Sequence, residues 1–239
     1  GGGIGGAICR EFAAEGARVV CVDIDEAAGT TTAASITAQG GQAKAQTCDV
    51  GRSDQVEAAV AAAVSAFGGL HILANCAAVF TREATLPELD EAEWRLALDV
   101  NITGAFHTSR FAVPVMAAGG GGSIIHVASQ MAKAANAGQT TYCVTKGALL
   151  MLAKGMALDH ATQGIRVNTL SPGGTATEGM AAKWGSMEAA EAAWGKPMHP
   201  LGRLGTPEEM ARAAVFLASD DSSFMTGADL VIDGGYTAR

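Results

Sequence analysis

Short apolar runs typical of β-strands alternate with longer helical patterns along all 239 residues of the chain. Such alternation favours an α/β fold in which a parallel sheet carries helices on both faces and the crossovers are right-handed. No linker or internal repeat interrupts it, so we expect one domain over residues 1–239. The expected strands are 18–23, 42–47, 70–74, 123–127, 164–169 and 229–232. The expected helices are 4–15, 25–39, 53–67, 88–118, 139–160 and 207–218.

The stretch at 178–200 departs from this alternation. It holds Met180, Trp184, Met187 and Trp194 among alanines and charged residues. Long segments without a strand in a compact domain are usually functional, and methionine side chains suit an adaptable apolar pocket. We interpret 178–200 as a substrate-binding loop segment. A pair of packed surface helices is the alternative.

Composition argues against several classes of function. A net charge of −8 without a Lys/Arg cluster disfavours nucleic acid as a partner. No apolar run reaches the length of a membrane span. The five cysteines contain no Cys-x-x-Cys pair and the five histidines show no metal-ligand spacing. We therefore predict a cytoplasmic protein with reduced thiols and no bound metal.

The first 23 residues follow the order turn, helix, strand and carboxylate. The glycines at 1–6 lead into a helix, and the β-rich run that follows ends at Asp23, 18 residues after Gly5. A glycine turn lets backbone N–H groups approach a pyrophosphate at a helix N-terminus, whose dipole favours the anion. A carboxylate ~20 residues further on is placed to hydrogen-bond a ribose. This order predicts dinucleotide binding.

Ser129, Tyr142 and Lys146 form the candidate catalytic group. Tyr142 and Lys146 are four residues apart, so they share one face of a helix. Ser129 follows a buried strand, at the end of the sheet where ligands bind in open α/β folds. A cation near a phenol favours the phenolate. We therefore expect Lys146 to lower the pKa of Tyr142 toward the range in which acid–base work is efficient.

These features resemble those of the short-chain dehydrogenase/reductase family, and the resemblance covers nearly the whole chain. Gly3-Ile4-Gly5 is similar to the end of the family's Thr-Gly-x-x-x-Gly-x-Gly motif. Asn75-Cys76-Ala77-Ala78 resembles Asn-Asn-Ala-Gly, with Cys76 and Ala78 as departures. The other matches are Asp49-Val50, Asn101, the 172–177 turn with Thr175 in place of an aliphatic residue, and the ending at 226–235.

The resemblance implies a Rossmann-like doubly wound sheet in the order 3-2-1-4-5-6-7. It also implies an NAD(P)-dependent oxidoreductase that transfers a hydride between NAD(H) and a secondary alcohol or ketone. Tyr142 would be the general acid–base and Ser129 would hold the reacting oxygen. Lys146 would also hold the nicotinamide ribose, and Asn101 would anchor a water that relays protons to Lys146. The implied cofactor contacts are Gly3, Ile4, Gly5, Asp23, Ile24, Asp49, Val50, Asn75, Ala77, Tyr142, Lys146, Pro172, Gly173, Thr175 and Thr177.

The family is usually tetrameric or dimeric, so a homotetramer or homodimer is implied as well. Asp23 should favour NAD, because the 2′-phosphate of NADP would place negative charge beside its carboxylate. An NADPH-dependent 3-oxoacyl thioester reductase and a non-catalytic NAD-binding protein of the same fold are alternatives. An S-adenosylmethionine methyltransferase also uses such a turn, but it would have no use for Ser129, Tyr142 and Lys146. The sequence does not identify the small-molecule alcohol or ketone.

Residue 1 already lies inside the glycine turn, whereas the family's first strand precedes that turn in the middle of the sheet. We therefore expect the first strand to be missing, with 18–23 and 70–74 separated by about two strand spacings, ~9.5 Å. Buried N–H and C=O groups without partners cost ~1–3 kcal/mol each. We therefore expect these 239 residues to be an N-terminally truncated part of a longer protein.

Overall fold

The structure, a computed structural model, describes residues 1–238. Its strands pair in parallel throughout this part of the chain. They are β1 (Arg18–Asp23), β2 (Gln42–Thr47), β3 (Ile72–Asn75), β4 (Gly122–Val127), β5 (Ile165–Pro172) and β6 (Asp229–Ile232). All six expected strands are therefore confirmed, with boundaries shifted by a few residues at most.

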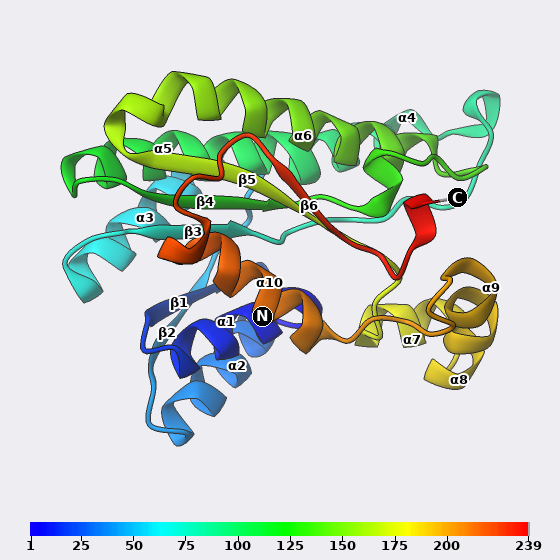
Figure 1. Ribbon diagram of the computed structural model, residues 1–239, viewed down its shortest axis with the longest axis horizontal. Helices are drawn as coiled ribbons and strands as arrows, with labels where there is room; N and C mark the ends of the chain where they lie inside the picture. The colour runs from blue at the N-terminus through cyan, green and yellow to red at the C-terminus, as the bar shows by residue number, and fades with distance from the viewer. Residues whose placement is uncertain (239) are drawn as a thin grey trace.

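The strands form two sheets (Figure 1). One has the order β1-β2 and the other the order β3-β4-β5-β6. As expected, β1 and β3 are not neighbours, and within residues 1–238 no strand pairs with both. The α/β architecture with a parallel sheet is confirmed. The single order 3-2-1-4-5-6-7 stays a prediction.

The helices follow the expected positions with one exception. They are α1 (Gly3–Ala14), α2 (Glu26–Ala38), α3 (Ser53–Phe67), α4 (Glu91–Leu98), α5 (Gly104–Ala118), α6 (Thr140–His160), α7 (Glu178–Trp184), α8 (Met187–Ala190), α9 (Lys196–Met198) and α10 (Pro207–Ala218). The helix expected over 88–118 is present as one continuous helical run from Glu91 to Ala118. The exception is a π-type turn at Asp99–Thr103 inserted between α4 and α5, and such turns occur frequently at functional sites.

Helices cover both faces of the four-stranded sheet. In Figure 1, α5 and α6 lie along one face, and α10 lies on the opposite side together with α1, which it contacts extensively. Both faces of the sheet carry apolar side chains that need cover, because successive side chains of a strand such as β4 point to opposite faces. Ile124 packs in a cluster with residues of α5 and α6, whereas Ile125 and Val127 pack with α1 and α10.

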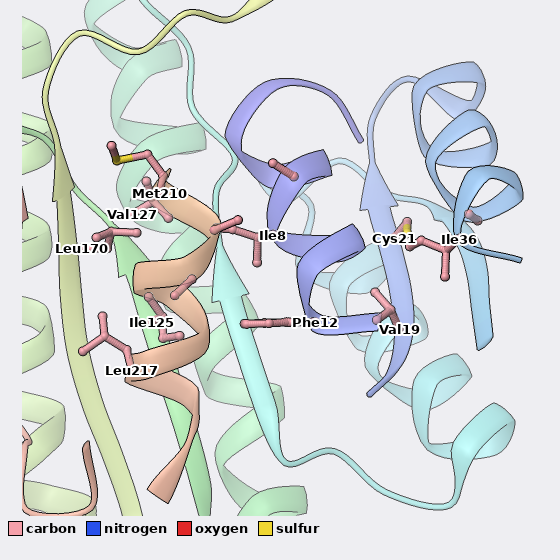
Figure 2. Packing of buried hydrophobic residues seen from close by; sticks show 14 residues of the cluster. Ile8, Phe12, Val19, Cys21, Ile36, Ile125, Val127, Leu170, Met210 and Leu217 are labelled. Carbon is pink, nitrogen blue, oxygen red and sulfur yellow. The ribbon is translucent and has the colours of Figure 1, made fainter. Parts of the chain in front are cut away.

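One hydrophobic cluster connects the two sheets. Ile8 and Phe12 of α1 pack together with Val19 of β1, Ile125 of β4 and Leu217 of α10 (Figure 2). Full burial of a large apolar side chain contributes ~1.5–3 kcal/mol. The helix that begins in the glycine turn is therefore fixed against both sheets, and so is the position of its N-terminus.

The segment 178–200 is helical and contains no strand. It holds α7, α8, a π-type turn at Glu191–Gly195 and α9. These short helices form a group beyond the carboxyl ends of β5 and β6 (Figure 1). Its assignment as the substrate-binding segment stays a prediction.

Candidate active site

Ser129 lies two residues beyond the end of β4, where the chain leaves the sheet. Its backbone is extended, and its Oγ accepts a hydrogen bond of 3.1 Å from the Met131 amide, which starts a turn over Gln130–Ala132. The side chain also hydrogen-bonds Tyr142. The hydroxyl is therefore held at the carboxyl end of the sheet, as expected.

Tyr142 and Lys146 lie in the first two turns of α6. The Nζ of Lys146 is 5.6 Å from the centroid of the Tyr142 ring and donates a hydrogen bond of 2.7 Å to the Val127 carbonyl oxygen at the end of β4. Both side chains are buried. The structure thus brings Ser129, Tyr142 and Lys146 together.

Burial decides the ionisation of the pair. It raises the pKa of Tyr142 well above its usual range, and the hydrogen bond from Ser129 only partly opposes this effect. Burial also lowers the pKa of Lys146 to about 8, with a small opposing effect from Cys76. The expectation that Lys146 lowers the pKa of Tyr142 below its usual range was therefore wrong. Both groups lose water, and this loss outweighs their proximity.

Asn101 lies in the π-type turn between α4 and α5. Its Oδ1 accepts a hydrogen bond of 2.8 Å from the Val79 amide, and its Nδ2 donates to the Val79 carbonyl oxygen at 3.1 Å. The same Nδ2 lies 3.1 Å from Thr145 Oγ1, one residue before Lys146. Asn101 thus connects α6 to the segment after β3. A direct contact with Lys146 is not among its hydrogen bonds.

The glycine turn lies at the N-terminus of α1, next to Thr177 and Cys76. Gly3 has a φ of +52°, and a Cβ built on it would lie 3.4 Å from Thr177 Cγ2. A Cβ on Gly5 would lie 3.2 Å from the Cβ of Cys76, next to Ala77. Ile4 lies between these glycines in the first turn of α1, whose first N–H groups have no acceptor inside the helix. Backbone there can approach a ligand that a side chain would exclude.

Asp23 ends β1, and Ile24 next to it is exposed. The Asp23 carboxylate accepts a hydrogen bond of 2.9 Å from the Asp25 amide and lies next to the backbone nitrogen of Gly1. It therefore lies beside the glycine turn, as ribose recognition requires.

A small cavity of about 10 Å³ is lined by several of the other expected cofactor and catalytic residues. Val50, Asn75, Ala77 and Asn101 are among those that line it. This volume is about that of one water-sized probe. Asp49, beside Val50, accepts a hydrogen bond of 2.9 Å from the Gly51 amide. These residues, from three separate segments, therefore meet at this edge of the sheet.

Asn75 is oriented by two neighbours. Its Nδ2 lies 3.1 Å from Nδ1 of His126, and its Oδ1 accepts a hydrogen bond of 2.7 Å from the Thr108 hydroxyl. Burial, and secondarily Lys146, lowers the pKa of His126 to about 4. His126 is therefore neutral at pH 7 and accepts the amide proton of Asn75. Its Nε2 has no hydrogen-bond partner within residues 1–238.

The turn after β5 is fastened to the segment 178–200. Pro172 ends the strand, and Thr175 Oγ1 donates to the Gly173 carbonyl oxygen at 3.0 Å. His199 Nε2 accepts from the Gly174 amide at 3.0 Å, and its Nδ1 lies 2.8 Å from the Trp194 carbonyl oxygen. These contacts fix His199 as the Nδ1–H tautomer. Thr177 precedes α7 as its N-cap, and its Oγ1 accepts a hydrogen bond from the Met180 amide.

Two residues of this region carry no role in the sequence analysis. His199 holds the turn through backbone groups, and only its neighbours in the fold reveal that. Phe80 stacks on Tyr142 with 4.6 Å between ring centroids. Phe80 follows the Asn75–Ala78 motif by two residues, which is the only sequence signal for it.

Within residues 1–238 there is no group of three potential metal ligands, and no helix there could cross a membrane.

Known proteins resemble this chain over nearly its whole length. The family described as enoyl-(acyl carrier protein) reductase matches residues 1–237. Cyclohexanol dehydrogenase of Acinetobacter sp. (strain SE19) is 37% identical over 239 residues, which cover 100% of this chain and 92% of that protein.

Solved structures agree with these sequence matches. Gluconate 5-dehydrogenase from Burkholderia cenocepacia J2315, in complex with NADP and tartrate, has a TM-score of 0.91 at 34% identity, covering 99% of this chain and 92% of that one. A 7 alpha-hydroxysteroid dehydrogenase complexed with NADH and 7-oxo glycochenodeoxycholic acid has a TM-score of 0.91 at 33% identity, covering 98% and 89%.

The fold and these matches define the class of protein. The chain belongs to the short-chain dehydrogenase/reductase family, and it is an oxidoreductase. The resemblance stated from the sequence is confirmed.

Proposed function

We propose that this protein transfers a hydride between NAD(H) and a secondary alcohol or ketone, within a single catalytic domain over residues 1–239. The observation that carries the proposal is the buried group of Ser129, Tyr142 and Lys146 at the carboxyl end of β4. Cyclohexanol dehydrogenase and 7 alpha-hydroxysteroid dehydrogenase are named for reactions at secondary carbinols, which supports this reaction class.

The residues of the site fit a dinucleotide. The supporting observation is the turn at Gly3 and Gly5: Gly3 has a φ of +52°, and a Cβ on Gly5 would lie 3.2 Å from the Cβ of Cys76, so this turn favours glycine and leaves its backbone bare for a ligand. Gly3, Ile4 and Gly5 would hold the pyrophosphate, and Asp23 and Ile24 the adenosine end. Asp49, Val50, Asn75 and Ala77 would line the middle. Pro172, Gly173, Thr175 and Thr177 would hold the nicotinamide, which supplies or accepts the hydride when bound.

The side chains of the protein handle the proton. Because its pKa is raised, Tyr142 is a neutral phenol at pH 7, and it can donate its proton to a carbonyl oxygen during reduction. Ser129 orients that oxygen by a second hydrogen bond. Lys146 holds the ribose and brings positive charge to the phenol, which stabilises the phenolate as the proton leaves. Asn101 positions the segment that covers Tyr142 and would anchor a water that relays protons to Lys146.

NAD is the proposed cofactor, because the Asp23 carboxylate would repel a 2′-phosphate. The related structures contain NADP in one case and NADH in the other. We therefore base the choice of NAD over NADP on Asp23, the residue at the end of β1. We place the protein in the cytoplasm, where its five free cysteines stay reduced.

A homotetramer or homodimer completes the proposal. Large apolar side chains are exposed on the two long helices α5 and α6, namely Phe106, Val144, Met151 and Leu158. Symmetric association would bury them. Light scattering at micromolar concentration should give two or four times the protomer mass. A monomer would contradict this part.

The function is tested by screening secondary alcohols and ketones with NAD(H) and with NADP(H). We expect reversible change of the nicotinamide absorbance with at least one alcohol–ketone pair. An acetoacetyl thioester in the same screen tests the thioester reductase alternative. Tight NADH binding with no turnover across the screen would favour a non-catalytic NAD-binding protein.

A further inference from the structure

Phe80 covers the face of the Tyr142 ring. The two rings are stacked at 4.6 Å between centroids, with 20° between their planes. Tyr142 is only 7% exposed, whereas Phe80 is 70% exposed. One face of the Phe80 ring therefore contributes to the burial of Tyr142, and most of the rest of the side chain faces solvent.

The segment that carries Phe80 is held on both sides. Before it, the Asn101 amide binds both backbone groups of Val79, and Asn101 is itself buried. After it, the Ala84 amide donates a hydrogen bond of 3.0 Å to the Gly138 carbonyl oxygen. Glu83 pairs with Lys183 of α7 at 2.9 Å. Backbone hydrogen bonds on both sides therefore hold the segment that carries Phe80, and the exposed ion pair of Glu83 with Lys183 adds little to them.

A single exposed phenylalanine is common on protein surfaces and needs no special explanation. Phe80 differs because it lies against the residue that would exchange a proton with the substrate. A substrate oxygen bound by Tyr142 and Ser129 brings its carbon skeleton next to the Phe80 ring. Phe80 offers this skeleton an apolar surface and no hydrogen bond, and the charges of Glu83 and Lys183 are paired with each other.

We propose that Phe80 determines specificity, by favouring secondary alcohols whose carbinol carbon lies in an apolar ring over open-chain polyols. This inference depends on the proposed alcohol oxidation. A ring packs flat against an aromatic face, as aromatic and aliphatic groups do in protein cores. A polyol would lose water from hydroxyls that Phe80 cannot hydrogen-bond.

The test compares kcat/KM for cyclohexanol, 2-propanol and D-sorbitol in three variants. Phe80→Ala removes the ring, and Phe80→Leu keeps an apolar surface. Phe224→Ala is the matched control, because Phe224 is a fully exposed phenylalanine outside the site. One methylene in an apolar site changes kcat/KM by about 10–200-fold. We therefore expect Phe80→Ala to lower both the cyclohexanol to D-sorbitol ratio and the cyclohexanol to 2-propanol ratio at least tenfold. Phe80→Leu should stay within about threefold of the wild type, and Phe224→Ala should not change either ratio.

Two results would overturn the inference while leaving the oxidoreductase function intact. One is a wild-type preference for D-sorbitol over cyclohexanol. The other is an equal loss for cyclohexanol and 2-propanol in Phe80→Ala, which would mean that Phe80 acts only by burying Tyr142. A shift in the pH profile of that variant, restored by Phe80→Leu, would identify this second case.

If the wild type oxidises no alcohol, the proposed function fails. The role of Phe80 is then tested separately, by measuring how tightly a cyclic ketone binds. Cyclohexanone binding would then be followed by ligand-observed NMR in the presence of NAD. At least tenfold weaker binding to Phe80→Ala than to the wild type would support the role of Phe80. Equal binding would refute it.

Discussion

The buried ammonium of Lys146 makes a quantitative prediction about stability. Burial lowers its pKa from 10.5 to about 8, so the folded protein holds this proton less tightly than the unfolded chain does. The sign follows from linkage, since stability rises with pH wherever the unfolded state binds more protons. The unfavourable contribution is complete below about pH 8 and disappears as the pH rises toward 10.5.

The magnitude follows from the size of the shift. Each pKa unit corresponds to ~1.4 kcal/mol, so the charged Lys146 lowers the free energy of unfolding by about 3 kcal/mol at neutral pH. At about pH 9.5 the folded amine is mostly neutral while the unfolded one is mostly charged, and the contribution falls to about 1 kcal/mol. Replacing Lys146 with methionine removes this unfavourable, pH-dependent contribution to the free energy of unfolding. It also removes the hydrogen bond to the Val127 carbonyl oxygen.

The assay is urea denaturation of the wild type, Lys146→Met and Lys154→Met at fixed protein concentration and at two pH values. Lys154 is an exposed lysine on the same helix. Relative to Lys146→Met, the wild type should gain about 2 kcal/mol between neutral pH and about pH 9.5. Groups that do not interact with Lys146 are present in all three proteins and largely cancel. Cys76 is the exception, because its pKa, which burial raises to about 11, is also lowered by Lys146. A difference that does not change with pH would show that Lys146 is not desolvated as described.

Two further substitutions test other parts of the site. Asp23→Ala should raise the dissociation constant of NAD and reduce the discrimination against NADP, as measured by cofactor titration; a wild type that already prefers NADP in kcat/KM would contradict the role of Asp23. Gly173→Ala would bring a Cβ to 2.8 Å from the Asp233 Cα and 3.0 Å from Gln130 Oε1, so it should destabilise the protein by ~1–3 kcal/mol. In the same denaturation assay Gly155→Ala, whose Cβ meets nothing within 4 Å on α6, should stabilise it by ~0.5–1 kcal/mol; equal effects of the two would refute the steric argument.

The sequence was sufficient for the strands and for the meeting of Ser129, Tyr142 and Lys146. Strand patterns are local, and an i, i+4 pair on a helix has a fixed geometry. The carboxyl end of β4 then places Ser129 without further information, because ligand sites of open α/β sheets lie at that end.

Features that depend on tertiary contacts could not be predicted in the same way. The helical pattern at 88–118 is continuous in sequence, and the π-type turn at Asn101 is visible only where its amide binds Val79. The ionisation of Tyr142 depends on how much water is excluded, which spacing does not report. The stacking of Phe80 joins residues 62 positions apart, and no local pattern specifies it.

The most direct test of the central claim is the activity of Tyr142→Phe beside its affinity for NADH. This substitution keeps the ring that stacks on Phe80 and removes only the proton donor. Turnover of the best substrate in the screen should fall by ~10²–10⁴, as expected for the loss of a general acid–base, while the dissociation constant of NADH stays nearly unchanged. A phenylalanine variant that retains about a third of the wild-type turnover would contradict the assignment of Tyr142, against the losses typical of such groups.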